Sequence, residues 1–154
     1  MVLEEVEKEF SLRRAESIDG IPTFYCHREL VLPLMERLKR DFEVLLDITA
    51  VDYLGRKEKR FELVYHLLSL SEKMRLRIKV ELGEGEKIPT LSFLWKNANW
   101  LEREVYDMFG IEFQGHPDLR RILLYPEFKG HPLRKDYPLK KSQPRIKLLR
   151  PERE

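Results

Sequence analysis

The chain changes character at Gly110, and this change limits the possible folds more than any other feature of the sequence. Before Gly110, apolar residues recur with the periods of strands and helices. After it the sequence has little periodicity and contains six prolines, at positions 117, 126, 132, 138, 144 and 151. Proline fixes φ and lacks a backbone donor, so it is rare inside helices and central strands. We therefore expect a folded domain over residues 1–110 and an extended arm over residues 111–154.

Length and composition are those of a single domain with one hydrophobic core. The chain has 154 residues, of which 42% are hydrophobic and 36% are charged. The charged share exceeds the usual ~25%, and asparagine and glutamine together number four. This bias is typical of heat-adapted proteins and also of charge-rich subunits of complexes. A net charge of +2 is too small to indicate a nucleic-acid partner.

The first part of the chain predicts a sheet. Five segments have strand patterns: residues 10–17, 21–26, 44–53, 61–70 and 74–82. Asp19-Gly20 and residues 71–73 each separate two of these segments, so two hairpins are expected. The third segment carries apolar residues on both faces at Val44-Leu45-Leu46, which predicts a central place in the sheet.

Helical periods occur in three segments: residues 28–41, 91–98 and 100–109. Asn99 followed by Glu102 is typical of a capped helix start, so a break near residues 97–99 is expected. Gly110 is the natural stop of the last helix. The predicted fold class is α+β, with a mixed or antiparallel sheet of about five strands, helices on one side, and the proline-rich arm after it.

Residues 102–139 contain the most distinctive motif. A helix ending Tyr106-Asp107-Met108-Phe109-Gly110 is followed by two Gly-His-Pro turns, at 115–117 and 130–132, each leading to a Leu-Arg pair. This run resembles the signature of the thirty-kilodalton subunit of respiratory complex I, the family of the C subunit of NADH:quinone oxidoreductase. Residues 45–53 also resemble that family's central strand.

The resemblance implies a cofactor-free structural subunit in the peripheral arm of a membrane-associated oxidoreductase, coupling NADH- or ferredoxin-linked electron transfer to ion translocation. The expected partners are the large quinone-site or hydrogenase-like subunit, iron–sulfur subunits that carry the clusters and, indirectly, the membrane arm. The expected location is peripheral, on the cytoplasmic side of the cell membrane. The isolated chain is expected to be inactive.

A subunit of a membrane-bound hydrogenase is the alternative within the same family. The sequence ends fifteen residues after Leu139, which is short beside the bacterial NADH-oxidising members. The electron donor therefore stays open between NADH, ferredoxin, coenzyme F420 and hydrogen.

The resemblance also makes residues 111–154 a docking arm and assigns no catalytic, cofactor-binding or metal-binding residue. It implies an interface built from the signature residues, which are Glu102, Arg103, Glu104, Asp107, Gly110, Gly115, His116, Pro117, Asp118, Arg120, Arg121, Gly130, His131, Pro132, Arg134, Asp136 and Tyr137. Each histidine is expected to bond across its own turn and to a partner surface.

Metal and cofactor chemistry find little support in the residues themselves. Cys26 is the one cysteine, whereas an iron–sulfur cluster needs about four thiolate ligands. His116 and His131 lie fifteen residues apart with no second ligand at zinc spacing. The sequence also has no glycine loop of the type that holds nucleotide phosphates.

Three carboxylates at 102, 104 and 107 raise the alternative of a free-standing enzyme. Their spacing spreads them around a helix, and Arg103 with Asp107 forms an i,i+4 pair that is expected to brace it. General acid–base catalysis would require a pocket and a partner base, and the sequence indicates neither.

The arginines of the arm raise a second alternative, an RNA-binding module. Acidic residues interleave with them, and a carboxylate repels a phosphate backbone. We therefore expect Arg120 or Arg121, and Arg134, to pair with carboxylates, at least one of them across a subunit boundary. We also expect other chains to bury the apolar residues of the arm, which are Ile111, Phe113, Leu119, Ile122, Leu123 and Leu124.

Overall fold

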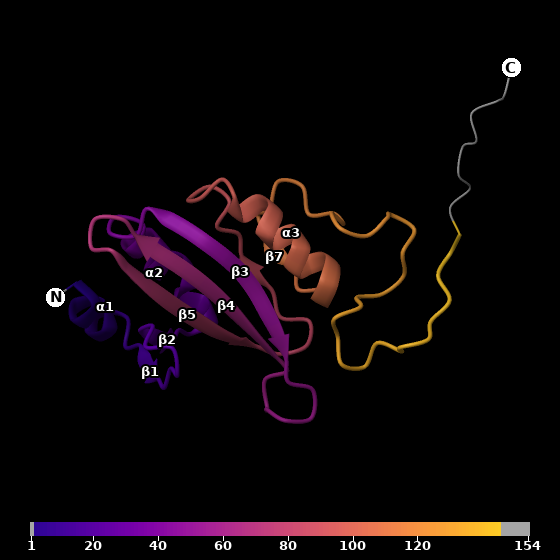
Figure 1. The fold of residues 1–154 in the computed structure, drawn as a ribbon, viewed down its shortest axis with the longest axis horizontal. Coiled ribbons are helices and arrows are strands. Elements are labelled where there is room, and N and C mark those ends of the chain that lie inside the picture. The colour runs from indigo at the N-terminus through magenta and orange to yellow at the C-terminus, as the bar shows by residue number, and fades with distance from the viewer. Residues whose placement is uncertain (1, 146–154) are drawn as a thin grey trace, which may run out of the picture.

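A computed structural model describes residues 2–145 and shows an α+β fold (Figure 1). The helices are α1 (Val2–Glu9), α2 (Val31–Leu38) and α3 (Ala98–Phe109), with a 3-10 turn, η1 (Arg28–Leu30), before α2. The strands are β1 (Arg13–Ala15), β2 (Thr23–Tyr25), β3 (Val44–Asp52), β4 (Phe61–Ser69), β5 (Met74–Leu82), β6 (Ile88–Pro89) and β7 (Phe113–Gln114). The α+β fold class predicted from the sequence is confirmed.

The main sheet has five strands in the order β1-β2-β5-β4-β3. Both predicted hairpins form, because β1 pairs antiparallel with β2 and β4 pairs antiparallel with β5. The two hairpins join through β2 and β5, which run parallel with Phe24 opposite Ile78. The sheet is therefore mixed.

The core lies on one face of this sheet. Alternate residues of β4 and β5 point to that face, beginning with Phe61 and Leu76, and they are almost fully buried. They belong to one hydrophobic cluster with Leu34 of α2 and Val105 of α3. The helices α2 and α3 therefore cover the same face, as the sequence predicted.

The predicted central place of residues 44–53 is wrong, because β3 is an edge strand. A β-bulge between Leu45 and Asp47 interrupts its pairing with β4. Leu45 points into the core, whereas Leu46 stays 40% exposed on the outer face. An apolar run on both faces favours burial on both sides, but only one face of this strand is covered.

The predicted helix over residues 91–98 is also wrong. Consecutive turns occupy this segment, and α3 begins at Ala98. The indole Nε1 of Trp95 donates to the carbonyl of Glu43 (3.1 Å), and the amide of Asn97 donates to the carbonyl of Leu45 (2.8 Å). These bonds hold the segment against the start of β3. They stabilise turns in place of the helix that the period of the apolar residues predicts.

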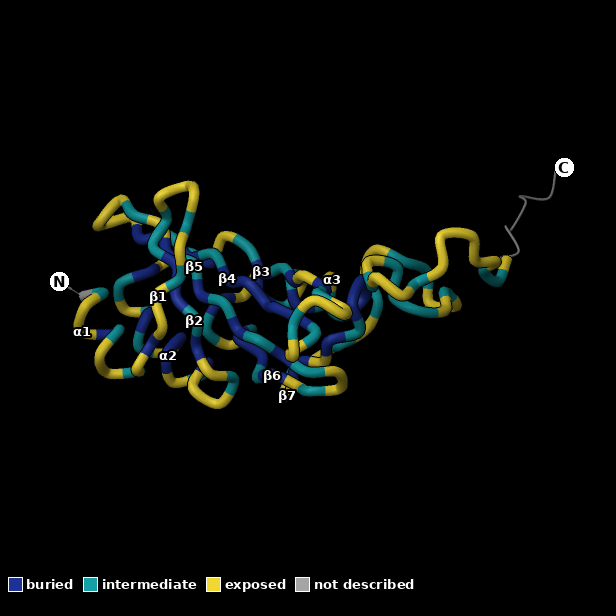
Figure 2. The backbone as a smooth tube through the Cα atoms, turned by 90° about the horizontal axis from the view of Figure 1, so that it is seen from below, coloured by how far each residue is buried: buried dark blue, intermediate teal, exposed yellow. Residues whose placement is uncertain are grey.

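Residues 111–145 consist mainly of loops and turns, apart from the short strand β7, which pairs parallel with β6. Ile111 and Phe113 are buried in the core of their own domain, which corrects the expectation that other chains cover them. Farther along, exposed and half-buried residues predominate (Figure 2). The domain division at residue 110 stays a prediction, and residues 146–154 of the predicted arm lie outside the described residues.

Candidate functional site

The signature residues lie on α3 and in the loops that follow it. This helix ends at Gly110, whose φ of 77° is left-handed, as the sequence predicted. Four groups of contacts hold the following loops: one around Asp107, one at each Gly-His-Pro turn, and an ion-pair network around Arg60. We call these loops, residues 115–137, the docked arm.

Asp107 is the centre of the first group, and its side chain is fully shielded from solvent. Its Oδ2 accepts the backbone N–H groups of Ile122, Leu123 and Leu124 at 3.1, 2.9 and 2.9 Å. Its Oδ1 accepts from Nη1 of Arg121 at 2.7 Å. Burial acts to raise the pKa of Asp107, but the amides and the guanidinium outweigh it and hold that pKa below its ordinary value.

Two arginines extend this group. Nη2 of Arg121 donates to the carbonyl of Gly130 (2.8 Å), so this side chain joins the two Gly-His-Pro segments to α3. Arg103 donates to the carbonyls of Arg120 (3.1 Å) and Arg121 (3.0 Å). The predicted brace between Arg103 and Asp107 is therefore wrong, because each side chain serves the docked arm instead.

The second Gly-His-Pro turn caps the C-terminus of α3. Nδ1 of His131 donates to the carbonyl of Asp107 (2.9 Å). The N–H of Leu133 donates to the carbonyl of Met108 (3.1 Å). These carbonyls have no partner within the helix, so the turn satisfies them. A Cβ added to Gly110 would lie 2.7 Å from the His131 ring, which leaves room for glycine alone.

The first Gly-His-Pro turn packs against the start of α3 through His116, whose side chain is shielded from solvent. Nδ1 accepts the N–H of Asp118 (3.0 Å), so the expected bond across the turn forms. The other nitrogen, Nε2, must then carry the proton that it donates to the carbonyl of Asn99 (2.9 Å). This second bond lies within the chain rather than on a partner surface.

Glu102 lies beneath this turn and is fully buried. Its Oε1 accepts the N–H of Leu91 (2.6 Å), and its Oε2 lies 2.5 Å from Oγ1 of Thr90 and 3.8 Å from Nε2 of His116. The spacing of Asn99 and Glu102 suggests a helix cap, but the Glu102 carboxylate bonds to Thr90 and Leu91 instead. Burial raises the pKa of Glu102 to about 7, against the opposing effect of its two hydrogen bonds.

The end of the docked arm is held by an ion-pair network that the sequence does not indicate. Arg60 forms ion pairs with Asp52 (2.8 Å), Asp136 (2.8 Å) and Glu84 (2.7 Å). The N–H of Lys135 donates to Asp52 (2.8 Å). Arg60, Asp52 and Glu84 come from strand ends and loops, where a single charged residue carries no recognisable pattern.

Within the arm, Arg134 pairs with Glu84, and Tyr137 stacks on Phe128 with ring centroids 6.2 Å apart. Gly130, with a φ of 95°, leaves room for the Tyr137 ring, which an added Cβ would meet at 2.9 Å. The arm therefore packs both on α3 and on its own aromatic side chains, which the sequence does not predict.

The remaining signature residues lie at or near the surface. Asp118 and Arg120 form an exposed ion pair (2.9 Å). Gly115 has a φ of 80°, Glu104 and Pro117 are exposed, and Pro132 is half-buried.

This geometry opposes the two alternatives raised by the sequence. Glu102 and Asp107 are buried with separate partners, and Glu104 is exposed, so the three carboxylates share no reaction site. Arg120, Arg121 and Arg134 all pair with carboxylates, as expected, and are not free for a phosphate backbone. The partners of these three arginines lie in this chain, and the expected pair across a subunit boundary stays a prediction.

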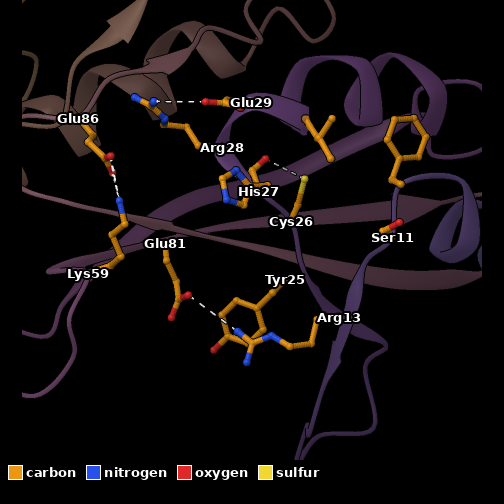
Figure 3. Close-up of a pocket in the computed structure, with 12 residues that line it drawn as sticks. Ser11, Arg13, Tyr25, Cys26, His27, Arg28, Glu29, Lys59, Glu81 and Glu86 are labelled. Atoms are coloured by element: carbon orange, nitrogen blue, oxygen red, sulfur yellow. Dashed lines mark hydrogen bonds and ion pairs between the residues drawn. The ribbon is translucent and has the colours of Figure 1, made fainter.

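A cavity of about 580 Å³ lies beside Tyr25 and Cys26 (Figure 3). Its charged side chains pair with one another, in the pairs Arg13–Glu81, Arg28–Glu29 and Lys59–Glu86. Cys26 is buried, and burial raises its pKa to about 12, which disfavours the reactive thiolate form. We assign no site to this cavity.

Among residues 2–145 there is no group of three histidine, cysteine or acidic residues placed to hold a metal ion. The same stretch contains no helix that is long and apolar enough to cross a bilayer.

Comparison with known families gives one match over most of the chain. Residues 24–143 match the model of the respiratory-chain NADH dehydrogenase 30 Kd subunit. The C subunit of NADH-quinone oxidoreductase from Geobacter sulfurreducens is 52% identical over 123 residues, covering 78% of this chain and 76% of that protein. Its counterpart from Roseobacter denitrificans is 54% identical over 112 residues, covering 70% of this chain and 56% of that protein.

Two solved structures share the fold. A trypsin-resistant fragment of Nqo5 has a TM-score of 0.71 and 37% identity, covering 77% of this chain and all of the fragment. A chain of the membrane-bound sulfane sulfur reductase, an archaeal respiratory membrane complex, has a TM-score of 0.77 and 26% identity. That match covers 90% of this chain and 84% of the other.

Proposed function

Because the chain belongs to the family of the 30 Kd subunit of respiratory-chain NADH dehydrogenase, we propose that it is a cofactor-free structural subunit of a complex I-like oxidoreductase. Its place is the peripheral arm of that complex, on the cytoplasmic side of the membrane. It docks on the large subunit that lines the quinone site, beside the iron–sulfur subunits. It fixes the positions of the neighbouring chains, and those chains supply the redox groups for electron transfer.

The use of the signature residues inside the chain is the observation that carries this proposal. Asp107, Arg121 and His131 fix the docked arm to α3, and none of them faces a reaction site. Meanwhile several large apolar side chains stay exposed, namely Ile122, Leu123, Leu133 and Leu139. A segment that has a fixed shape and exposes apolar residues is typical of a protein-binding surface.

Fixing the arm in advance is physically useful for assembly. Ordering a loop at the moment of binding costs conformational entropy, which reduces the affinity. The contacts of Asp107 and Arg60 meet that cost within the folded domain. The neighbouring subunit then meets a surface that is already formed.

A second candidate keeps the same structural role in a different complex. A chain of an archaeal respiratory membrane complex has the same fold, with a TM-score of 0.77 and 26% identity. The second candidate is therefore a ferredoxin-linked or hydrogenase-type relative, in which the electron donor differs and the docking role is the same.

Purification of the tagged chain from its own cells tests both candidates. We expect the large subunit and an iron–sulfur subunit to co-purify, identified by mass spectrometry, with ion-translocating oxidoreductase activity in the intact assembly. The chain produced alone is expected to show no turnover and no stoichiometric iron, zinc or flavin. Turnover or a bound redox group on the isolated chain would contradict the proposal, and the identities of the partners decide between the candidates.

A further inference from the structure

We propose that the Asp19-Gly20 turn is a site of spontaneous covalent modification, the isomerisation of aspartate, and that the guanidinium of Arg77 slows this reaction in the folded chain. The turn joins β1 to β2 at the edge of the main sheet. The proposal concerns the chemical lifetime of the chain and does not depend on its docking role.

Aspartate isomerisation needs no reactant other than the chain itself and water. The peptide nitrogen of the next residue attacks the side-chain carboxyl carbon and forms a C–N bond, while the N–H proton and the carboxyl hydroxyl leave together as water. Water then opens the resulting succinimide ring at either carbonyl. One product is aspartate again, and the other is isoaspartate, in which the main chain runs through the former side chain. An ionised carboxylate reacts poorly, because it has no hydroxyl that can leave as water.

Asp19 is the aspartate whose neighbour favours this reaction. Of the seven aspartates in the sequence, six precede large side chains, which hinder the attack, and Asp19 alone precedes a glycine. Gly20 has a φ of 72°, and a Cβ added to it would meet nothing within 4 Å, so the turn has room to rearrange. The Asp19 side chain is 46% exposed, which gives water access to the ring.

The contacts of the Asp19 carboxylate both favour and oppose the reaction. Its Oδ1 accepts the N–H of Ile21 (3.1 Å), a bond that spans Gly20 and keeps the carboxyl group beside the attacking peptide. Its Oδ2 accepts from Nη2 of Arg77 at 2.6 Å, and the hydroxyl of Ser17 also donates to Oδ1. Of these partners, Arg77 alone is charged, and it is the main cause that holds the pKa of Asp19 well below its ordinary value. The carboxylate therefore stays in its unreactive ionised form.

The backbone of Arg77 fixes the guanidinium in this place. Arg77 lies on β5 opposite Thr23 of β2, and its N–H donates to the carbonyl of Pro22 (2.9 Å). Its side chain is 18% exposed. Isoaspartate at residue 19 would lengthen the main chain of the turn and move the carboxylate away from Arg77. The change would act next to the Ala15–Thr23 pair, where the hairpin of β1 and β2 closes.

The experiment compares Arg77→Gln with Arg75→Gln, a control from the same face of β5 whose side chain is exposed. Each purified full-length chain is incubated at neutral pH below its unfolding temperature. Isoaspartate at residue 19 is quantified over time by mass spectrometry with electron-transfer fragmentation, which distinguishes the two isomers. We expect Arg77→Gln to form isoaspartate about tenfold faster or more, because each unit by which the pKa of Asp19 rises gives about tenfold more of the un-ionised acid. Arg75→Gln is expected to leave the rate unchanged.

Two further measurements separate the charge of Arg77 from its packing. Arg77→Lys keeps a cation beside Asp19 and is expected to restore most of the protection. Hydrogen exchange of the β2 amides shows whether the hairpin stays paired in Arg77→Gln. Equal rates of isomerisation in the natural chain and in Arg77→Gln overturn the proposal. A faster rate that accompanies loss of β2 protection and persists in Arg77→Lys also overturns it, because opening of the hairpin then explains the rate.

Discussion

Replacing Asp107 by asparagine is expected to release the docked arm from α3 and to lower the free energy of unfolding by about 3 kcal/mol. An asparagine oxygen can accept the amides of residues 122–124, but its amino group then faces the guanidinium of Arg121. Breaking a buried ion pair typically costs 3–5 kcal/mol, and the lower end applies because the Arg121 side chain is 16% exposed. Chemical denaturation and limited proteolysis between residues 120 and 137 measure the effect.

The pH dependence of the free energy of unfolding gives a second test of the role of Asp107. The pKa of Asp107 is lower in the folded chain than in the unfolded chain. Its contribution to stability is therefore fully present above the unfolded value, about pH 4, and is lost as the pH falls through the lowered pKa. This loss is expected to be absent from Asp107→Asn.

Asp118→Asn is the matched control, because Asp118 lies on the same arm and its ion pair with Arg120 is exposed. An exposed pair contributes between 0 and about 1 kcal/mol, so little change is expected. Equal stability of Asp107→Asn and Asp118→Asn would contradict the role assigned to Asp107.

Replacing Glu102 by glutamine is expected to stabilise the chain at pH 8 by up to about 3 kcal/mol. The pKa of Glu102 rises from its ordinary 4.5 to about 7 on folding, so the folded chain binds this proton more tightly than the unfolded chain. Below about pH 4.5 the carboxylate therefore does not reduce the free energy of unfolding. The reduction grows up to about pH 7 and stays constant above that. Glutamine removes the buried charge and hence the reduction.

The hydrogen bonds around Glu102 allow this substitution. The glutamine oxygen can accept from the N–H of Leu91, as Oε1 does now, and its amino group can donate to Oγ1 of Thr90. The hydroxyl of Thr90 then remains free to donate to Ser92, 2.9 Å away. His116 is the titratable side chain within 4 Å of the carboxylate.

Denaturation of the natural chain and of Glu102→Gln between pH 4 and pH 8 measures this effect. The two curves are expected to meet near pH 4.5 and to separate as the pH rises. Glu104→Gln, two residues along the helix and exposed, is the control and is expected to change stability by less than about 0.5 kcal/mol. A less stable Glu102→Gln at pH 8 would contradict a destabilising buried charge at Glu102.

The elements that the sequence predicted correctly are those whose signals are local. The hairpin of β4 and β5 follows from strict alternation, and the end of α3 follows from a glycine that alone adopts the left-handed φ easily. The single face covered by helices follows from the polar residues that alternate along β5.

The errors concern features that depend on distant parts of the chain. The place of β3 at the edge is set by which strands pair, and its apolar outer residue Leu46 does not reveal that one face lacks cover. The turns over residues 91–97 depend on carbonyls of the β3 segment, about fifty residues away, to which Trp95 and Asn97 bond. The periodicity of the local sequence does not indicate such a bond.

The contacts among the signature residues could not be predicted from the sequence, and their role as an interface stays a prediction. The resemblance to the family identified Asp107 and Arg121, whereas spacing on a helix wrongly paired Asp107 with Arg103. The partners from outside the signature, Arg60 and Thr90, escaped the sequence because each acts through a contact with a residue far along the chain.

Hydrogen exchange of single amides in the isolated chain tests most directly whether the arm is formed before it meets a partner. The N–H groups of Ile122, Leu123 and Leu124 are expected to exchange at least about a hundredfold more slowly than in an unstructured chain, because Asp107 accepts all three. In Asp107→Asn the same three amides are expected to lose that protection. Unprotected exchange at these amides in the isolated natural chain would contradict a preformed arm, because the arm would then take its shape only on binding.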